Sequence, residues 1–171
     1  KVKSAVGEPD WRSGNIATHI SMIVESYRDY ARTRKVNLQY TVKGDILTDF
    51  VPDYINKIMN NLLSNAFKFT PEYGKITVFL WKEDNRLKLD IADTGSGISE
   101  EDIAYIFEPF YQAPNENSTI GTGVGLALVK QIVDSIDGTI TAESTLGKGT
   151  TFHLAIPILH GKNQVRQPPI G

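Results

Sequence analysis

The stretch NNLLSNAFKFT, from Asn60 to Thr70, predicts a helix that packs on one side and carries polar groups on the next. At about 100° per residue, Asn61, Asn65 and Lys68 fall within roughly 60° of one another. The neighbouring apolar stripe consists of Ile55, Ile58, Met59, Leu62, Leu63 and Ala66. Because asparagine is a weak helix former, two such residues in the middle of a helix indicate a function.

These polar side chains have the chemistry of a nucleotide site. A carboxamide oxygen can coordinate a hard cation such as Mg²⁺, and a lysine can neutralise a phosphate. On this stretch alone, a solvated helix face explains Asn61, Asn65 and Lys68 equally well. The choice between the two therefore depends on the rest of the chain.

Composition restricts the class of protein. The 171 residues are enough for one domain with a sizeable core. A net charge of −2 and a charged fraction of 22% argue against a nucleic-acid partner, and the lack of cysteine excludes disulfides and thiolate metal sites. No apolar run approaches about 18 residues, so we expect neither a membrane span nor a signal peptide. The start at Lys1 suggests a piece of a longer protein.

Apolar periodicity divides the chain into helices and strands. Asn15 can cap a helix that runs to about Thr33, and Pro52 starts the central helix, which ends near Pro71. The other expected elements are helices over 100–106 and 124–136 and strands over 36–42, 46–51, 76–81, 87–92, 139–144 and 150–156. In the last strand the alternation leaves His153 outward, without a chemical role.

This order of elements predicts an α+β fold. Two hairpins, and strands that do not alternate strictly with helices, favour a two-layer α/β sandwich. We expect a mixed, mostly antiparallel sheet of about five strands with three helices on one face. The domain should span residues 15–157, and residues 1–14 and 158–171 are expected to be linkers.

Two glycine-rich stretches carry further chemistry. In DTGSGI, Asp93 ends a strand and can accept a hydrogen bond from an exocyclic amine such as that of adenine, while Gly95 and Gly97 let backbone approach a flat ligand. A tight turn explains this stretch by itself. The second stretch, GTGVGL over 121–126, opens a helix and offers N–H groups to phosphate, although it is not a Walker loop. A further glycine pair in GKGT, over 147–150, has a simple hairpin as its alternative explanation.

The order of these stretches is more specific than any one of them. An asparagine helix, DTGSG, FEPFYQ, GTGVGL and GKGT follow one another between Asn61 and Thr150. This order strongly resembles the catalytic ATP-binding domain of sensor histidine kinases, in the superfamily that includes gyrase, Hsp90 and MutL. The resemblance covers roughly residues 15–157 and implies the ligands ATP and Mg²⁺.

The resemblance implies a role for each matching position. Asn65 would coordinate Mg²⁺, Asn61 would lie near the phosphates, and Lys68 would contact a phosphate; these three are the implied catalytic residues. The residues implied to bind ATP are Asn61, Asn65, Lys68, Phe69, Asp93, Gly95, Gly97, Ile98, Phe107, Gly121, Thr122, Gly123, Val124, Gly125, Leu126 and Thr150. Among them, Asp93 would bind the adenine amine, and Thr150 would help through a water.

A flexible ATP lid is also implied. Gly121, Gly123 and Gly125 would hinge it. Phe107 and Phe110 would anchor it to the domain and to the helices of a partner domain.

Three departures from the family pattern bear on the reaction. Position 61 is asparagine where ATP hydrolases of the superfamily carry a general-base glutamate, and an amide cannot take a proton from water. No histidine stands in the sequence setting of a phosphoacceptor. No lysine or arginine lies between Lys88 and Lys130, so Lys68, Mg²⁺ and backbone N–H groups must compensate the charge of the phosphates.

We therefore expect the ATP-binding domain of a bacterial two-component histidine kinase, a transferase that is inactive alone. It would transfer the γ-phosphate of Mg–ATP to a histidine on a separate dimerisation domain of the same protein, for relay to a response regulator. The isolated domain should be monomeric and cytoplasmic, within a homodimeric parent that can be membrane-anchored. The alternatives are an ATP-hydrolysing clamp of the gyrase or Hsp90 type and a degenerate nucleotide-sensing scaffold.

Overall fold

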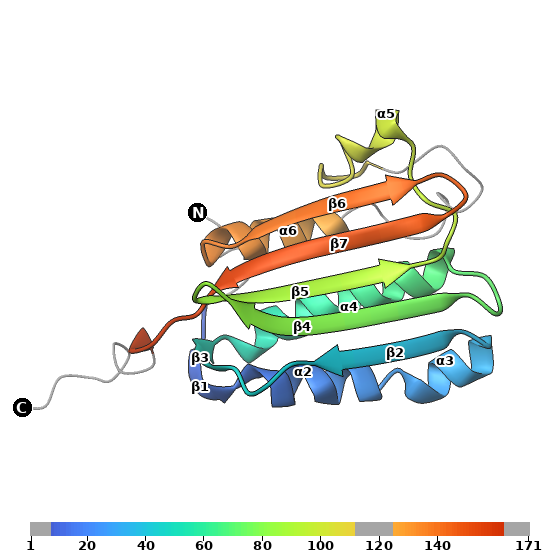
Figure 1. The fold of residues 1–171 in the computed structure, drawn as a ribbon. Helices are drawn as coiled ribbons and strands as arrows, with labels where there is room; N and C mark the ends of the chain where they lie inside the picture. The colour runs from blue at the N-terminus through green and yellow to red at the C-terminus, as the bar shows by residue number, and fades with distance from the viewer. Residues whose placement is uncertain (1–7, 112–124, 163–171) are drawn as a thin grey trace, which may run out of the picture.

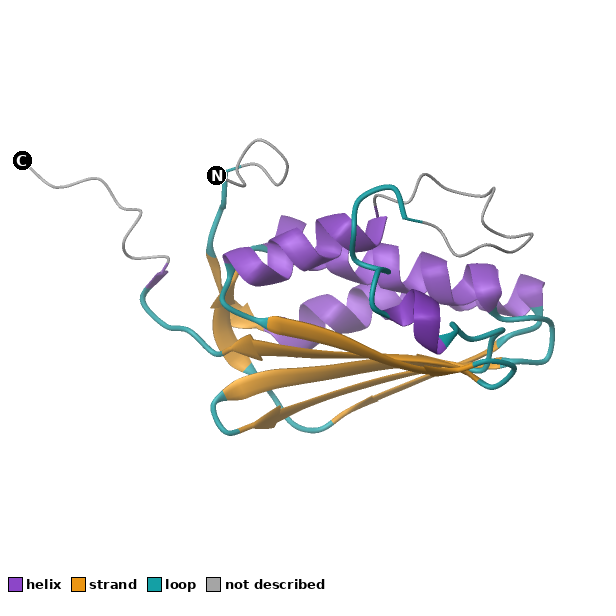
Figure 2. Cartoon of the chain, turned by 90° about the horizontal axis from the view of Figure 1, so that it is seen from above, coloured by secondary structure: helices purple, strands orange, loops and turns teal. Residues whose placement is uncertain are grey.

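The computed structural model describes residues 8–111 and 125–162, and in these ranges helices lie over one face of a sheet (Figure 1, Figure 2). The elements are β1 (Arg12–Asn15), α2 (Ile16–Glu25), α3 (Arg28–Arg34), β2 (Asn37–Val42), β3 (Leu47–Phe50), α4 (Pro52–Phe69), β4 (Lys75–Glu83), β5 (Arg86–Asp93), α5 (Glu100–Ile103), α6 (Gly125–Ser135), β6 (Thr139–Thr145) and β7 (Gly149–Pro157). The predicted α+β fold class is confirmed. None of these helices is long and apolar enough to cross a membrane.

The main sheet has five strands in the order β2-β4-β5-β7-β6. β2 runs parallel to β4, and the remaining neighbours are antiparallel. The apolar alternation of the strands gives the sheet one buried face, since every second residue of β4, β5 and β7 is buried. The described helices leave the opposite face of the sheet uncovered (Figure 2).

The central helix α4 runs along the length of the sheet (Figure 1). Its 18 residues begin with Pro52 in the first turn, where the missing N–H costs nothing. The predicted apolar stripe is buried against the sheet and α2. Phe67, near the end of α4, is also buried, with 1% of its surface exposed. Its ring contacts those of Tyr27 and Tyr30 at centroid distances of 5.8 and 5.0 Å.

The prediction of one continuous helix over 15–33 is wrong, because the helix is interrupted between Glu25, the end of α2, and Arg28, the start of α3. The Ser26 hydroxyl donates to the Ile23 carbonyl at 2.5 Å, and the Tyr27 N–H donates to the Val24 carbonyl, a tighter turn than an α-helix makes. Tyr27 then donates to Asn60 of α4 at 2.7 Å. A tertiary contact therefore overrides the local helical pattern, although the predicted cap at Asn15 is confirmed.

Ordered structure extends past both ends of the predicted domain. β1 pairs antiparallel with β3 as a separate two-stranded sheet, and Ile158 is 5% exposed. β1 and Ile158 are therefore part of the packed structure, whereas residues 1–7 and 163–171 lie outside the described ranges. The helix predicted over 100–106 is shorter, since α5 ends at Ile103.

His153 faces outward as predicted, and it joins three strands on the open face of the sheet. Its Nδ1 lies 2.8 Å from Asp90 of β5, and its Nε2 lies 3.0 Å from Glu143 of β6. Burial of the ring lowers its pKa, but the hydrogen bonds and charges of Glu143 and Asp90 outweigh this effect and raise the pKa above its ordinary 6.5.

We expect this cluster to stabilise the domain at acidic pH. Because the folded pKa of His153 is raised, its stabilisation is fully present below 6.5 and is lost as the pH rises through the folded pKa. The side chain is 36% exposed, so solvent screening limits the contribution to about 0.2–1 kcal/mol.

Urea unfolding at about pH 5.5 and about pH 9 checks this expectation. His153→Gln should lower the free energy of unfolding at the lower pH only, and His160→Gln, at an exposed position, is the control. An equal loss for His153→Gln at both pH values would contradict the expectation.

Candidate ATP-binding site

The site begins where Asn61 of α4 meets the start of α6. The Asn61 amide donates through Nδ2 to the Lys57 carbonyl at 2.7 Å, which turns its Oδ1 toward Gly125. A Cβ added at Gly125 would lie 2.6 Å from that oxygen, so a side chain there would displace the amide. The predicted asparagine helix and the predicted glycine stretch therefore meet at these two residues.

Asn65 and Lys68 continue the same side of α4 and are half-buried. The Lys68 ammonium lies 5.1 Å from the centroid of the Phe69 ring. Burial lowers the pKa of Lys68, so a nearby anion would compensate the cost of keeping its charge. The helix thus offers two amides and one partly desolvated cation in a row.

Asp93 ends β5 beside the end of α4. Its Oδ1 accepts from the Gly95 N–H at 2.9 Å. A Cβ at Gly95 would lie 2.5 Å from the Phe69 carbonyl oxygen, so only a glycine lets the loop rest directly on α4. This close approach joins the aspartate stretch to the asparagine helix.

The carboxyl group of Asp93 is half-buried. Burial raises its pKa, while hydrogen bonds from the backbone of Gly95 and Thr150 act in the opposite direction. Thr150 faces Asp93 directly across the β5–β7 ladder. A further donor, such as an amine, would favour the charged form of this carboxyl group.

Ser144 of β6 belongs to the candidate site but was missed in the sequence analysis. Its hydroxyl accepts from the Ile98 N–H at 2.6 Å, donates to the Gly149 carbonyl at 2.9 Å and lies 2.8 Å from the Thr150 hydroxyl. It therefore fixes the loop after Asp93 to the β6–β7 turn. The pairing of Ser144 with Thr150 depends on strand register, which no local motif in TITAEST reveals.

Gly97 completes this loop. Its φ is +78°, and a Cβ there would lie 2.2 Å from the Thr145 carbonyl oxygen. Both the left-handed backbone and the close approach require glycine at this position. The loop and the β6–β7 turn are also joined by the Gly147 N–H, which donates to the Ser96 carbonyl at 2.8 Å.

The two phenylalanines of FEPFYQ lie in different environments. Phe107 packs against Phe152 of β7 with ring centroids 6.2 Å apart and an interplanar angle of 71°. Phe110 is 76% exposed and has a φ of +66°. Phe107 is thus fixed to the sheet, and Phe110 is presented to solvent.

Some predicted site residues cannot be placed. Gly121, Thr122, Gly123 and Val124, and with them most of the predicted lid, lie outside the described residues. Leu126 is half-buried in the first turn of α6 and packs against the core.

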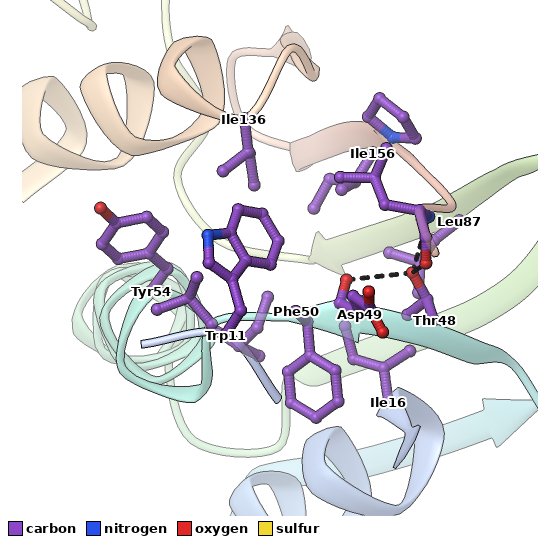
Figure 3. A pocket seen from close by; sticks show the side chains of 13 residues that line it. Trp11, Ile16, Thr48, Asp49, Phe50, Tyr54, Leu87, Ile136 and Ile156 are labelled. Atoms are coloured by element: carbon purple, nitrogen blue, oxygen red, sulfur yellow. Dashed lines mark hydrogen bonds between the residues drawn. The ribbon is translucent and has the colours of Figure 1, made fainter. Parts of the chain in front are cut away.

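A small apolar pocket lies at the other end of α4 (Figure 3). Trp11, Tyr54, Ile136 and Ile156 are among the side chains that line it. Tyr54 lies in the first turn of α4, whereas Asn65 and Lys68 are in its second half. The pocket is therefore separate from the candidate site.

The described residues thus unite an asparagine-bearing helix, an aspartate–glycine loop and a glycine at a helix start, at one end of an α+β sandwich. This combination defines an ATP-binding domain of the histidine-kinase type. The chain belongs to the histidine kinase-, DNA gyrase B- and HSP90-like ATPase family, whose model matches residues 50–160.

Individual relatives agree with this assignment. The chain is 36% identical over 170 residues to the autoinducer 2 sensor kinase/phosphatase LuxQ of Vibrio vulnificus (strain YJ016), covering 92% of this chain and 20% of LuxQ. It therefore spans about a fifth of the length of that relative.

Solved structures share the fold. The catalytic domain of histidine kinase ThkA has a TM-score of 0.77 at 24% identity, covering 88% of this chain and 97% of that one. ThkA in complex with the response regulator protein TrrA has a TM-score of 0.74 at 23% identity over 89% and 43%. Full-length ShkA in complex with AMPPNP has a TM-score of 0.77 at 27% identity over 91% and 32%.

We expect Gly125→Ala to weaken ATP binding by about tenfold or more, because the added Cβ must displace the Asn61 amide. Isothermal titration calorimetry measures the affinity. Gly14→Ala is the matched control, since a Cβ at Gly14 meets no atom within 4 Å. Equal ATP affinity in wild type and Gly125→Ala would show that the contact with Asn61 does not shape the site.

Proposed function

We propose that this domain binds Mg–ATP between α4, the Asp93 loop and the start of α6, and that it supplies the γ-phosphate to a histidine on a separate domain. The observation that carries the proposal is the Asn61–Gly125 contact. This contact places a neutral amide oxygen, which cannot act as a base, at the start of a helix.

We assign recognition of the adenine base to Asp93. Its half-buried carboxylate can accept from the exocyclic amine, and its position opposite Thr150 supports a shared water. Gly95, Gly97 and Ile98 would form the wall around the base, since they belong to the loop that rests on Phe69 and on β6. The loop is held from both sides, so the wall is preformed.

Magnesium is assigned to Asn65, with Asn61 near the phosphates. No group of three histidine or acidic side chains among residues 8–111 and 125–162 is arranged to hold a metal by itself. A single amide oxygen, that of Asn65, fits a cation that arrives with the nucleotide and keeps phosphate oxygens and water as its other ligands. When bound, the ion would neutralise phosphate charge.

Positioning and electrostatics would carry the reaction. Phosphoryl transfer asks little covalent chemistry of the protein, and Asn61 cannot act as a base toward water. Transfer to a side chain is thus favoured over hydrolysis. Because the sequence has no lysine or arginine between Lys88 and Lys130, Lys68 is the main side-chain cation that we assign to the phosphates.

The partner of this domain would be a dimerisation domain with the phosphoacceptor histidine, followed in the relay by a response regulator. The exposed Phe110 would contact the acceptor helices. The complex of ThkA with TrrA supports the response regulator as an indirect partner.

A second candidate is a scaffold domain that binds nucleotide without transferring phosphate. The absence of a basic residue between Lys88 and Lys130 favours it. Incubating the chain with γ-labelled ATP, Mg²⁺ and a histidine-bearing acceptor domain distinguishes the two. Label on the histidine supports the kinase, and binding without label supports the scaffold. Sustained ATP hydrolysis by the chain alone would instead support a clamp of the gyrase type.

We expect Asn65→Ala to remove most of the Mg²⁺-dependent part of ATP affinity, a loss of about tenfold or more. The affinities of wild type and variant are compared by calorimetry with Mg²⁺ and with EDTA. Ser64→Ala, at the exposed neighbouring position on α4, is the control. If Mg²⁺ strengthens ATP binding equally in wild type and Asn65→Ala, the metal assignment is wrong.

We expect Asp93→Ala to weaken ATP binding by about ten- to a hundredfold, because a hydrogen bond to a charged group is lost. Phosphorylation of the acceptor domain should fall in parallel. Asp90→Ala, on the same strand and bonded to His153 on the open face, is the control. An unchanged dissociation constant for Asp93→Ala would exclude the carboxylate from the adenine site.

A further inference from the structure

Strand β3 is held on its two sides by segments far apart in the sequence. β1 pairs with it on one side, with Ser13 directly opposite Asp49. On the other side the Asp49 N–H donates to the Leu159 carbonyl at 2.8 Å, and the Leu159 N–H donates to the Thr48 hydroxyl at 3.0 Å. The chain entering the domain and the chain leaving β7 therefore meet at one strand.

The buried carboxylate of Asp49 bonds to both segments at once. Its Oδ1 accepts from the Ser13 hydroxyl, and its Oδ2 accepts from the Lys162 N–H at 2.6 Å. Asp49 is only 6% exposed, so each of these hydrogen bonds replaces water that the charge would otherwise bind. Losing one of these two hydrogen bonds removes a constraint on the position of the carboxylate that accepts the other.

A second contact joins the same two segments. The Lys162 ammonium lies 5.5 Å from the centroid of the Trp11 ring. Trp11 and Leu159 also line the apolar pocket beside Asp49 (Figure 3). Apolar packing and a cation–π contact thus both hold residues 158–162 beside residues 11–15.

We propose that Asp49 is a latch that couples the segment entering the domain, residues 11–15, to the segment leaving it, residues 158–162. Displacing one segment loosens the other, although the two are not paired with each other as strands. The latch lies at the β1–β3 end of the domain, opposite the β6–β7 turn of the ATP site (Figure 1). It does not depend on the proposed phosphotransfer.

Through the latch, a displacement of either segment would change how firmly the other is held. A partner that draws residues 158–162 away would remove the Lys162 N–H from Asp49 and so weaken the hold of this carboxylate on β1. Equally, tension on β1 would reach residues 158–162 through the same carboxylate. Such a device would pass a mechanical change between the entering and the leaving segment without passing through the ATP site.

Hydrogen exchange by the Ser13→Ala variant tests the latch. Ser13 is exposed and contacts Asp49 through its hydroxyl, so the variant should fold. We expect the amides of Leu159 and Lys162, which the substitution does not touch, to exchange about tenfold faster than in wild type. Faster exchange confined to residues 12–15 would overturn the proposal.

Two further variants sharpen the test. Asp49→Asn keeps the shape but replaces one acceptor oxygen by a donor, and should speed exchange in both segments by about tenfold or more. Arg12→Ala is the control on the same strand, since its exposed side chain pairs with Asp10. The latch requires Arg12→Ala to leave exchange at Leu159 and Lys162 unchanged; acceleration equal to that of Ser13→Ala would contradict it.

Discussion

The close approach of Asn61 on α4 to Gly125 on α6 is the contact on which the candidate site depends. It brings the side-chain amide of Asn61 against the start of α6. The first backbone N–H groups of a helix have no partner within the helix and attract anions. A side chain at Gly125 would displace the Asn61 amide from this position. The contact therefore brings the polar side of α4 to the start of α6.

The sheet supplies the other half of the site through backbone contacts. Gly95 rests on the Phe69 carbonyl, and Gly97 rests on that of Thr145, so the Asp93 loop is clamped between a helix and a hairpin. Ser144 adds three hydrogen bonds to the same junction. The polar groups that would meet a nucleotide are therefore held by the fold before any ligand binds, which lowers the entropic cost of binding.

Sequence patterns predicted the features that local chemistry determines. The apolar stripe of α4, the β4–β5 hairpin and the Asn15 cap each follow from residues that are neighbours along the chain. The break at Ser26 and the pairing of β1 with β3 were not predicted, because they depend on partners such as Asn60 and Asp49 that lie far away in sequence. The cluster around His153 was missed for the same reason.

Chemical shift mapping by NMR tests the central claim most directly. The ¹⁵N-labelled chain is titrated with Mg²⁺ and a non-hydrolysable ATP analogue, and the amide resonances are followed. The account predicts that the largest shifts occur at Gly95, Ile98 and Gly125, with little change at Trp11. Largest shifts at Trp11 and the pocket around it, or no saturable shifts at all, would contradict the placement of ATP between α4 and α6.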